Sequence, residues 1–197
     1  FGGCVAKFLV WLGVWLAAAQ VGASPSVELN AAEREYLQTH GPVSLCIDPD
    51  WVPFETLNAR GEHEGIAADL LRLAAERGGV QLQLHKTRNW EASLAASKAG
   101  ACQMLSFLNQ SPERDAWLIF TRPLFTDVNV LISREEHPFV VDLSAFAGSS
   151  LALPVGTSIE ERVRHDYPAL RIVHTDSEAQ ALALVSERKA DLTMRSL

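Results

Sequence analysis

Polar and aromatic side chains gather at four places in the sequence, each at or near the end of a short apolar run typical of a buried strand. The four segments are residues 48–54, 106–114, 156–158 and 191–197. In open parallel sheets, ligands bind beyond the carboxyl ends of the strands. We therefore expect these segments to meet around one binding site.

The first two segments carry groups suited to holding a small polar solute. Trp51 and Phe54 offer aromatic surfaces for an apolar wall, with packing inside their own domain as the alternative. Arg114 presents a planar guanidinium that grips a carboxylate through paired hydrogen bonds. For this arginine, a surface salt bridge is the alternative role.

The third segment suits an anion, and the fourth adds two polar side chains. Thr157 and Ser158 stand at an expected strand-to-helix turn, where free N–H groups and the helix dipole favour negative charge. Ordinary helix capping explains the same two residues. The candidate ligand-binding residues are Asp48, Trp51, Phe54, Ser106, Asn109, Ser111, Arg114, Thr157, Ser158, Arg195 and Ser196.

Signatures of metal binding and of common catalytic chemistry are missing from the sequence. No pair of its 6 histidines shows helical ligand spacing, and no Cys-x-x-Cys, phosphate loop or nucleophile elbow occurs. We therefore predict no metal, no cofactor and no catalytic residue. A catalytic carboxylate pair stays open, because the chain has 24 acidic residues. A net charge of -7 argues against a nucleic-acid partner.

The elements that must position the candidate residues alternate between strand and helix. Strands are expected over residues 43–47, 80–84, 102–107, 128–132, 150–155, 171–174 and 191–194. Helices are expected over 31–39, 66–77, 90–99, 112–117, 159–165 and 178–188, the second with Ile66, Leu70, Leu73 and Ala74 on its buried face. Such alternation is typical of α/β units with mostly parallel sheets.

The chain divides into two blocks of this kind. We predict a linker and leader helix over residues 24–40, lobe 1 over 41–133, a crossover over 134–138 and lobe 2 over 139–197. A hinge is expected near Asn129–Ser133, where the chain passes between the lobes. The second lobe ends without a final helix, so we expect it to be incomplete.

The first residues are typical of an export signal. Lys7 precedes an apolar run of about a dozen residues, too short for a comfortable membrane span, and small residues follow up to Ala23. We predict a signal peptide over residues 1–23, with an uncleaved anchor helix as the alternative, and a location in the bacterial periplasm.

Export changes the interpretation of the cysteines. Cys4 would leave with the signal peptide, so Cys46 and Cys102 would remain as a pair in an oxidising compartment. The sequence leaves two alternatives for this pair, a disulfide or two buried free thiols, because it does not give the Cα separation that a bridge needs.

The order of these motifs resembles solute-binding protein family 3, which has the type II periplasmic-binding-protein fold. The resemblance rests on residues 48–55, Gly65–Leu70, Trp90, Ser111–Arg114, Phe120–Pro123 and Gly156–Ser158. It implies an α/β clamp of two lobes, the second truncated here. Residues 29–40, 108–114 and 188–191 are more closely similar to sensor regions of membrane-bound diguanylate cyclases and hybrid histidine kinases.

The resemblance implies a role for several candidate residues. Arg114 would hold a ligand carboxylate with the help of Thr157, while Asp48 and Trp51 would line the pocket. An acidic residue that holds the α-amino group in amino-acid binders falls near Ser196 here, which argues against a plain α-amino acid. The expected ligand is a polar or carboxylate-bearing small molecule: an amino acid, an organic acid or a similar solute.

The resulting hypothesis is an extracytoplasmic sensor domain that is not itself an enzyme. The alternatives are a free component of an amino-acid-type ABC transporter, a dehydratase- or lyase-like enzyme using Asp48 or Glu55, and a spacer that binds nothing. The sequence leaves open whether the chain forms a homodimer through a fused receptor. Membrane contact is expected only through an anchor or a helix beyond Leu197.

Overall fold

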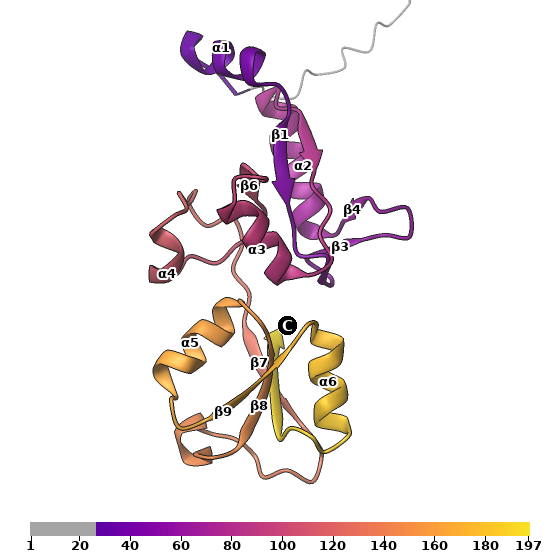
Figure 1. Ribbon diagram of the computed structural model, residues 1–197, viewed down its shortest axis with the longest axis vertical. Coiled ribbons are helices and arrows are strands. Elements are labelled where there is room, and N and C mark those ends of the chain that lie inside the picture. The colour runs from indigo at the N-terminus through magenta and orange to yellow at the C-terminus, as the bar shows by residue number, and fades with distance from the viewer. Residues whose placement is uncertain (1–26) are drawn as a thin grey trace, which may run out of the picture.

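The computed structural model describes residues 27–197, which form two lobes stacked along the long axis of the molecule (Figure 1). The predicted signal peptide over residues 1–23 lies outside the described residues. None of the helices in the described part has the length and the apolar composition needed to span a bilayer.

Lobe 1 is built on a parallel sheet in which β1 (Val43–Cys46) lies between β5 (Leu82–Leu84) and β6 (Met104–Leu105). The apolar end of β1 is buried, so this strand forms the centre of the lobe. The helices of the lobe are α1 (Ala31–His40), α2 (Ile66–Gly78), α3 (Trp90–Lys98) and α4 (Pro112–Asp115). A small antiparallel sheet follows β1 and consists of β2 (Asp50–Trp51), β3 (Glu55–Leu57) and β4 (His63–Glu64).

The buried face of α2 differs from the expected one. The larger residues predicted to be buried, Ile66, Leu70 and Leu73, are 38%, 38% and 41% exposed, and Ala74 is exposed as well. Ala67 and Ala68 are buried instead, where α2 packs against β3 and β4. Small side chains let this helix approach closely enough for the Ala67 amide to donate to the Phe54 carbonyl oxygen at 2.8 Å. That close approach, rather than the apolar spacing, fixes its rotation.

Lobe 2 has a mixed sheet with the order β7-β10-β8-β9. Its elements are β7 (Asn129–Ser133), the 3-10 helix η1 (Leu143–Phe146), β8 (Ser150–Pro154), α5 (Ser158–Asp166), β9 (Arg171–Thr175), α6 (Glu178–Ser186) and β10 (Leu192–Ser196). Successive side chains of β8 point to opposite faces. Leu151 and Leu153 therefore join the core cluster that contains Val163 of α5, and Ala152 joins the one that contains Ala181 of α6.

The position of β7 differs from the predicted division of the chain. Residues 128–132 were expected at the end of lobe 1, but β7 pairs with β10 in an antiparallel register from Asn129↔Ser196 to Ser133↔Leu192. The strand therefore belongs to the sheet of lobe 2. The chain passes between the lobes before Asn129, not over residues 134–138. Sequence periodicity identified this strand but carried no information about its partner.

Candidate functional site

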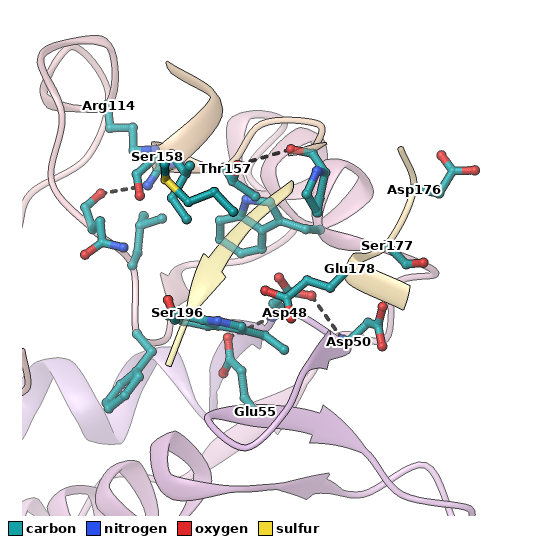
Figure 2. A pocket seen from close by; sticks show the side chains of 18 residues that line it. Asp48, Asp50, Glu55, Arg114, Thr157, Ser158, Asp176, Ser177, Glu178 and Ser196 are labelled. Carbon is teal, nitrogen blue, oxygen red and sulfur yellow. Dashed lines mark hydrogen bonds between the residues drawn. The ribbon is translucent and has the colours of Figure 1, made fainter. Parts of the chain in front are cut away.

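A pocket lies between the two lobes, and residues of both line it (Figure 2). Lobe 1 contributes Asp48, Asp50, Trp51, Glu55, Trp90, Phe107, Leu108, Asn109 and Arg114. Lobe 2 contributes Pro154, Thr157, Ser158, Ile159, Asp176, Ser177, Glu178, Met194 and Ser196. Figure 2 shows Arg114 and Ser158 toward one end, and Asp48, Asp50 and Glu178 toward the other. The carboxyl ends of strands in both sheets thus meet at one site, as expected.

Asp48 follows directly after the buried strand β1. Its Oδ1 accepts a hydrogen bond of 3.0 Å from the Asp50 amide. Burial raises the pKa of Asp48 to about 7, against the effect of that hydrogen bond. The nearby negative charges of Glu55, Asp50 and Glu178 add to the rise. This carboxyl group is therefore about half protonated at neutral pH, and a cation bound beside it would favour the ionised form.

Glu55 holds the loop that carries Asp48. It is buried, and its Oε1 accepts the Asp48 amide at 2.9 Å. Its Oε2 accepts the hydroxyl of Ser106 and lies 3.1 Å from Nε2 of His63. Because these contacts use both carboxylate oxygens, Glu55 positions Asp48 and joins β3 to the end of β6.

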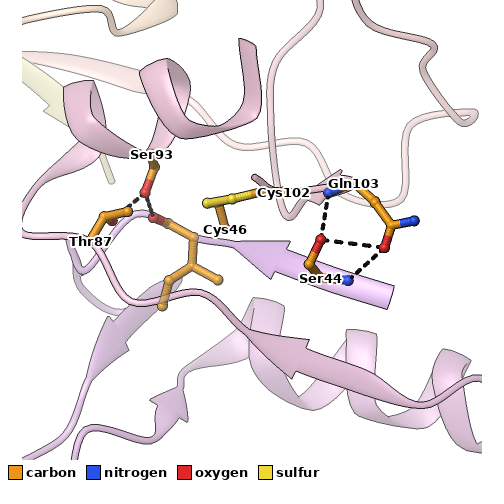
Figure 3. Close-up of a disulfide and its surroundings, with 7 residues drawn as sticks. Ser44, Cys46, Thr87, Ser93, Cys102 and Gln103 are labelled. Atoms are coloured by element: carbon orange, nitrogen blue, oxygen red, sulfur yellow. Dashed lines mark hydrogen bonds between the residues drawn. A yellow bond between two sulfur atoms is a disulfide. The ribbon is translucent and has the colours of Figure 1, made fainter. Parts of the chain in front are cut away.

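The end of β1 is fixed by further contacts (Figure 3). Cys46 and Cys102 form a disulfide with a Cα–Cα distance of 5.7 Å, so the bridged alternative is the one seen. The Ser93 hydroxyl of α3 donates to the Ile47 carbonyl oxygen at 2.6 Å. The end of β1 is thus connected covalently to the segment that leads into β6, and the Ile47 carbonyl just before Asp48 is connected by a hydrogen bond to α3.

Lobe 2 adds acidic groups to the same end of the pocket. Glu178 lies in the first turn of α6, and burial raises its pKa to about 6, with Asp50 adding to the rise. Arg195 opposes this rise, and its Nη2 lies 3.0 Å from Glu178 Oε2. Asp176 lines the pocket next to this pair. Arg88 lines a neighbouring pocket with Asp50 and Asp176, so the carboxylates of this region outnumber two guanidinium groups, those of Arg88 and Arg195.

Arg114 lies at the opposite end and is bonded to protein groups. Its Nη1 donates to the Asn109 carbonyl oxygen at 2.7 Å, and its Nη2 donates to the Gly156 carbonyl oxygen at 2.8 Å. Its Nε donates to Glu161 Oε1 at 3.2 Å. Burial lowers the pKa of Arg114, and the charge of Glu161 opposes that change. The guanidinium thus spans from lobe 1 to lobe 2.

The aromatic wall keeps Trp51, one of the two expected residues, but Phe107 takes the place expected for Phe54. Trp51 lines the pocket together with Phe107, their ring centroids 6.3 Å apart. Phe54 is 2% exposed and packs behind both, at 4.8 Å from Trp51 and 6.3 Å from Phe107. Phe54 is therefore a core residue that supports the wall.

The pocket brings together most of the predicted residues but not all of them. Those that line it are Asp48, Trp51, Asn109, Arg114, Thr157, Ser158 and Ser196. Phe54 and Ser106 lie behind it, and Ser111 caps α4 through a 3.3 Å hydrogen bond from the Arg114 amide. Arg195 lies beside it and donates to the Val52 carbonyl oxygen at 2.8 Å, which links the lobes. Thr157 caps α5 while also lining the pocket.

The residues that the sequence analysis missed are chiefly Trp90, Asp176, Ser177 and Glu178. The last three follow directly after β9, so they stand at a strand end like the segments that were selected. The same rule would have found them. Trp90 begins a helix, and its indole reaches the pocket only because α3 packs beside the turn at Gly156.

Comparisons with known proteins agree with this architecture. The virulence sensor protein BvgS of Bordetella pertussis is 23% identical over 167 residues, which cover 85% of this chain and 14% of BvgS. The chain therefore matches a small part of that protein's length.

Solved structures show the same fold at low identity. The B. pertussis BvgS periplasmic VFT2 domain matches with a TM-score of 0.73 at 22% identity, over 86% of this chain and 72% of that one. A glycine-to-alanine mutant of arginine-bound ArgBP from T. maritima matches with a TM-score of 0.70 at 20% identity, over 84% and 77%. The predicted α/β clamp of the type II periplasmic-binding-protein class is confirmed.

The family model for bacterial extracellular solute-binding proteins, family 3, matches residues 43–194. That span includes the three sheets apart from the last two residues of β10, and every residue predicted for the site except Arg195 and Ser196. The resemblance inferred from the order of the motifs is thereby confirmed, and this chain belongs to the bacterial extracellular solute-binding proteins, family 3.

Proposed function

We propose that this chain is the periplasmic ligand-binding part of a bacterial signalling receptor, and that its lobes close on a small solute carrying a positive charge. The observation that carries the proposal is the acidic end of the pocket between the lobes. There, Asp48 and Asp50 of lobe 1 lie near Glu178 of lobe 2.

A cationic ligand suits this arrangement electrostatically. The clamp brings these carboxylates together in a partly desolvated space, which raises the pKa of Asp48 and Glu178, although Arg195 opposes the rise at Glu178. An ammonium or guanidinium group would pair with carboxylates of both lobes at once. Ligand contacts with both lobes are what favour a closed state over an open one. The sequence favoured an anionic group at Arg114, but that guanidinium is paired with Glu161.

Two similarities support a sensor, and one supports transport. BvgS is a sensor protein, and the motifs also resemble sensor regions fused to diguanylate cyclases. ArgBP, which binds arginine, supports the alternative of a free transport component. Reading the gene beyond Leu197 separates the two: a membrane helix followed by an output domain supports the receptor, and a stop codon supports the transport component.

The second candidate function is a dehydratase- or lyase-like reaction, which the near-neutral pKa of Asp48 favours. Burial and neighbouring charge explain that pKa without catalysis, so binding is the stronger proposal. Incubation with each ligand that binds, followed by chromatography for products, decides between them. Stoichiometric binding without any product would exclude the enzymatic function.

A thermal-shift screen followed by calorimetry tests the ligand class. Agmatine and putrescine, which are cationic and lack a carboxylate, should raise the unfolding midpoint, whereas succinate should not. Asp48→Asn and Glu178→Gln should each weaken agmatine binding at least about tenfold, because each removes one charge partner.

The matched control is Glu187→Gln, which removes an exposed carboxylate paired with Lys189 outside the pocket lining. It should leave agmatine binding unchanged. Binding of succinate but of neither amine would contradict the proposed ligand class.

A further inference from the structure

The pairing of Arg114 with Glu161 suggests a role for Glu161 that deepens, and rests on, the proposed function. A guanidinium that lines a solute pocket ordinarily attracts carboxylates. Here the first turn of α5 supplies a carboxylate of its own to that guanidinium, with Arg114 Nε 3.2 Å from Glu161 Oε1.

The pair is shielded from water. The side chains of Arg114 and Glu161 are 4% and 13% exposed, and their contact crosses from α4 of lobe 1 to α5 of lobe 2. Screening by water is weaker for such a pair than for ion pairs on the surface. The contact therefore both neutralises the guanidinium and joins the lobes.

Glu161 lies behind Arg114 and outside the pocket lining. Its second oxygen, Oε2, is buried and has no hydrogen-bond partner within the described part of the chain. An incompletely bonded buried carboxylate is costly to keep unless an opposite charge holds it in place. Separation of the lobes would return both charges to water, so the pair exists only in the closed clamp.

We propose that Glu161 is a specificity-determining residue: it occupies Arg114 in place of a ligand carboxylate, disfavours carboxylate ligands and holds the lobes closed without a ligand. The Arg114 end of the pocket then carries little net positive charge, while the Asp48 end stays negative. A solute with a positive charge and no carboxylate is the class that fits both ends.

The test uses Glu161→Gln, which keeps the shape of the side chain and removes its charge. Succinate and L-glutamate should bind at least about tenfold more tightly to this variant than to the wild type, because Glu161 no longer neutralises the charge of Arg114. The matched control is Glu113→Gln. Glu113 pairs with Arg164 across the same lobes, but the two side chains are 64% and 53% exposed. This control should leave carboxylate binding unchanged, and equal carboxylate affinities in wild type and Glu161→Gln would overturn the role in specificity.

Interlobe distance tests closure separately and needs no ligand. Spin labels carried on unnatural amino acids at the exposed positions Glu76 of lobe 1 and Ser186 of lobe 2 report that distance. The ligand-free distance distribution should widen in Glu161→Gln and stay unchanged in Glu113→Gln.

An unchanged distribution in Glu161→Gln would overturn the role in closure, even if amine binding to the wild type succeeds. Failure of all amines to bind the wild type, with the widening still seen, would count against the proposed function alone.

Discussion

The indole Nε1 of Trp90 donates a hydrogen bond of 2.9 Å to the carbonyl oxygen of Gly156. This bond joins the first turn of α3 in lobe 1 to the turn between β8 and α5 in lobe 2. The same oxygen accepts Nη2 of Arg114. Gly156 has a φ of 76°, and a Cβ there would lie 2.9 Å from Leu94, so this turn requires glycine. Two of the hydrogen bonds between the lobes thus share one backbone carbonyl group.

Trp90→Phe should loosen the closed clamp. The change keeps an aromatic ring but removes the donor, and a single hydrogen bond of this kind contributes about 1 kcal/mol. Agmatine affinity should fall about fivefold in calorimetry, since about 1.4 kcal/mol corresponds to a factor of ten. Trp117→Phe, a matched change outside the pocket lining, should leave the affinity unchanged. Equal losses in the two variants would argue against an interlobe role for Trp90.

Asp48 should make stability depend on pH. Its pKa is raised from 3.8 to about 7 on folding, so the folded state binds a proton that the unfolded state releases in this window. This contribution to stability is complete below about pH 4 and is lost as the pH rises through about 7. Asp48→Asn stays neutral and can still accept the Asp50 amide. It should therefore exceed the wild type in free energy of unfolding by about 2–4 kcal/mol at pH 8.

Urea denaturation of both proteins at pH 4, 6 and 8 measures this difference, which should shrink toward zero at pH 4. Asp69→Asn, on the exposed face of α2, controls for the loss of one negative charge. A difference between Asp48→Asn and the wild type that does not change with pH would show that Asp48 ionises normally.

Removal of the Cys46–Cys102 disulfide should destabilise lobe 1. The bridge spans 56 residues, and disulfides that close loops of this size typically contribute about 2–4 kcal/mol by restricting the unfolded chain. The double variant Cys46→Ser, Cys102→Ser should therefore unfold at lower urea concentration. Reducing agent should lower the midpoint of the wild type and leave that of the double variant unchanged. A wild type insensitive to reductant would contradict this account.

Ser106→Ala should destabilise the loop that carries Asp48. The Ser106 hydroxyl donates to the buried Glu55 Oε2, and its loss leaves that oxygen with His63 as its remaining partner among the described residues. A buried charged group that loses one donor typically costs about 1–3 kcal/mol. Chemical denaturation should show this loss, whereas Ser97→Ala on α3 should stay within about 0.5 kcal/mol of the wild type.

Secondary structure and family could be predicted because their signals are local. Asn30 and Asn89 cap the helices that follow them, and each of the four segments selected at predicted strand ends contributes at least one residue to the pocket. The rotation of α2 and the sheet to which β7 belongs depend on distant partners. No local pattern around Ile66 or Asn129 contains that information.

The site could be located from the sequence, but its charge could not. Arg114 lines the pocket as expected, yet its charge is taken by Glu161, which stands 47 positions further along the chain. Glu178 likewise acquires its environment from Asp50 and Arg195, which come from different lobes. The net charge of a cleft is a sum over residues that only the folded chain brings together.

The pairing of β7 with β10 has a consequence for how the lobes move. At the corner where this pair ends, the amide of Leu197 donates to the carbonyl oxygen of Val128 at 3.0 Å. The position at which the chain enters lobe 2 is therefore hydrogen-bonded to residue 197. Rotation of the whole lobe about that corner changes few dihedral angles and displaces the residue at position 197 very little, while the far ends of α5 and α6 sweep through the largest arcs.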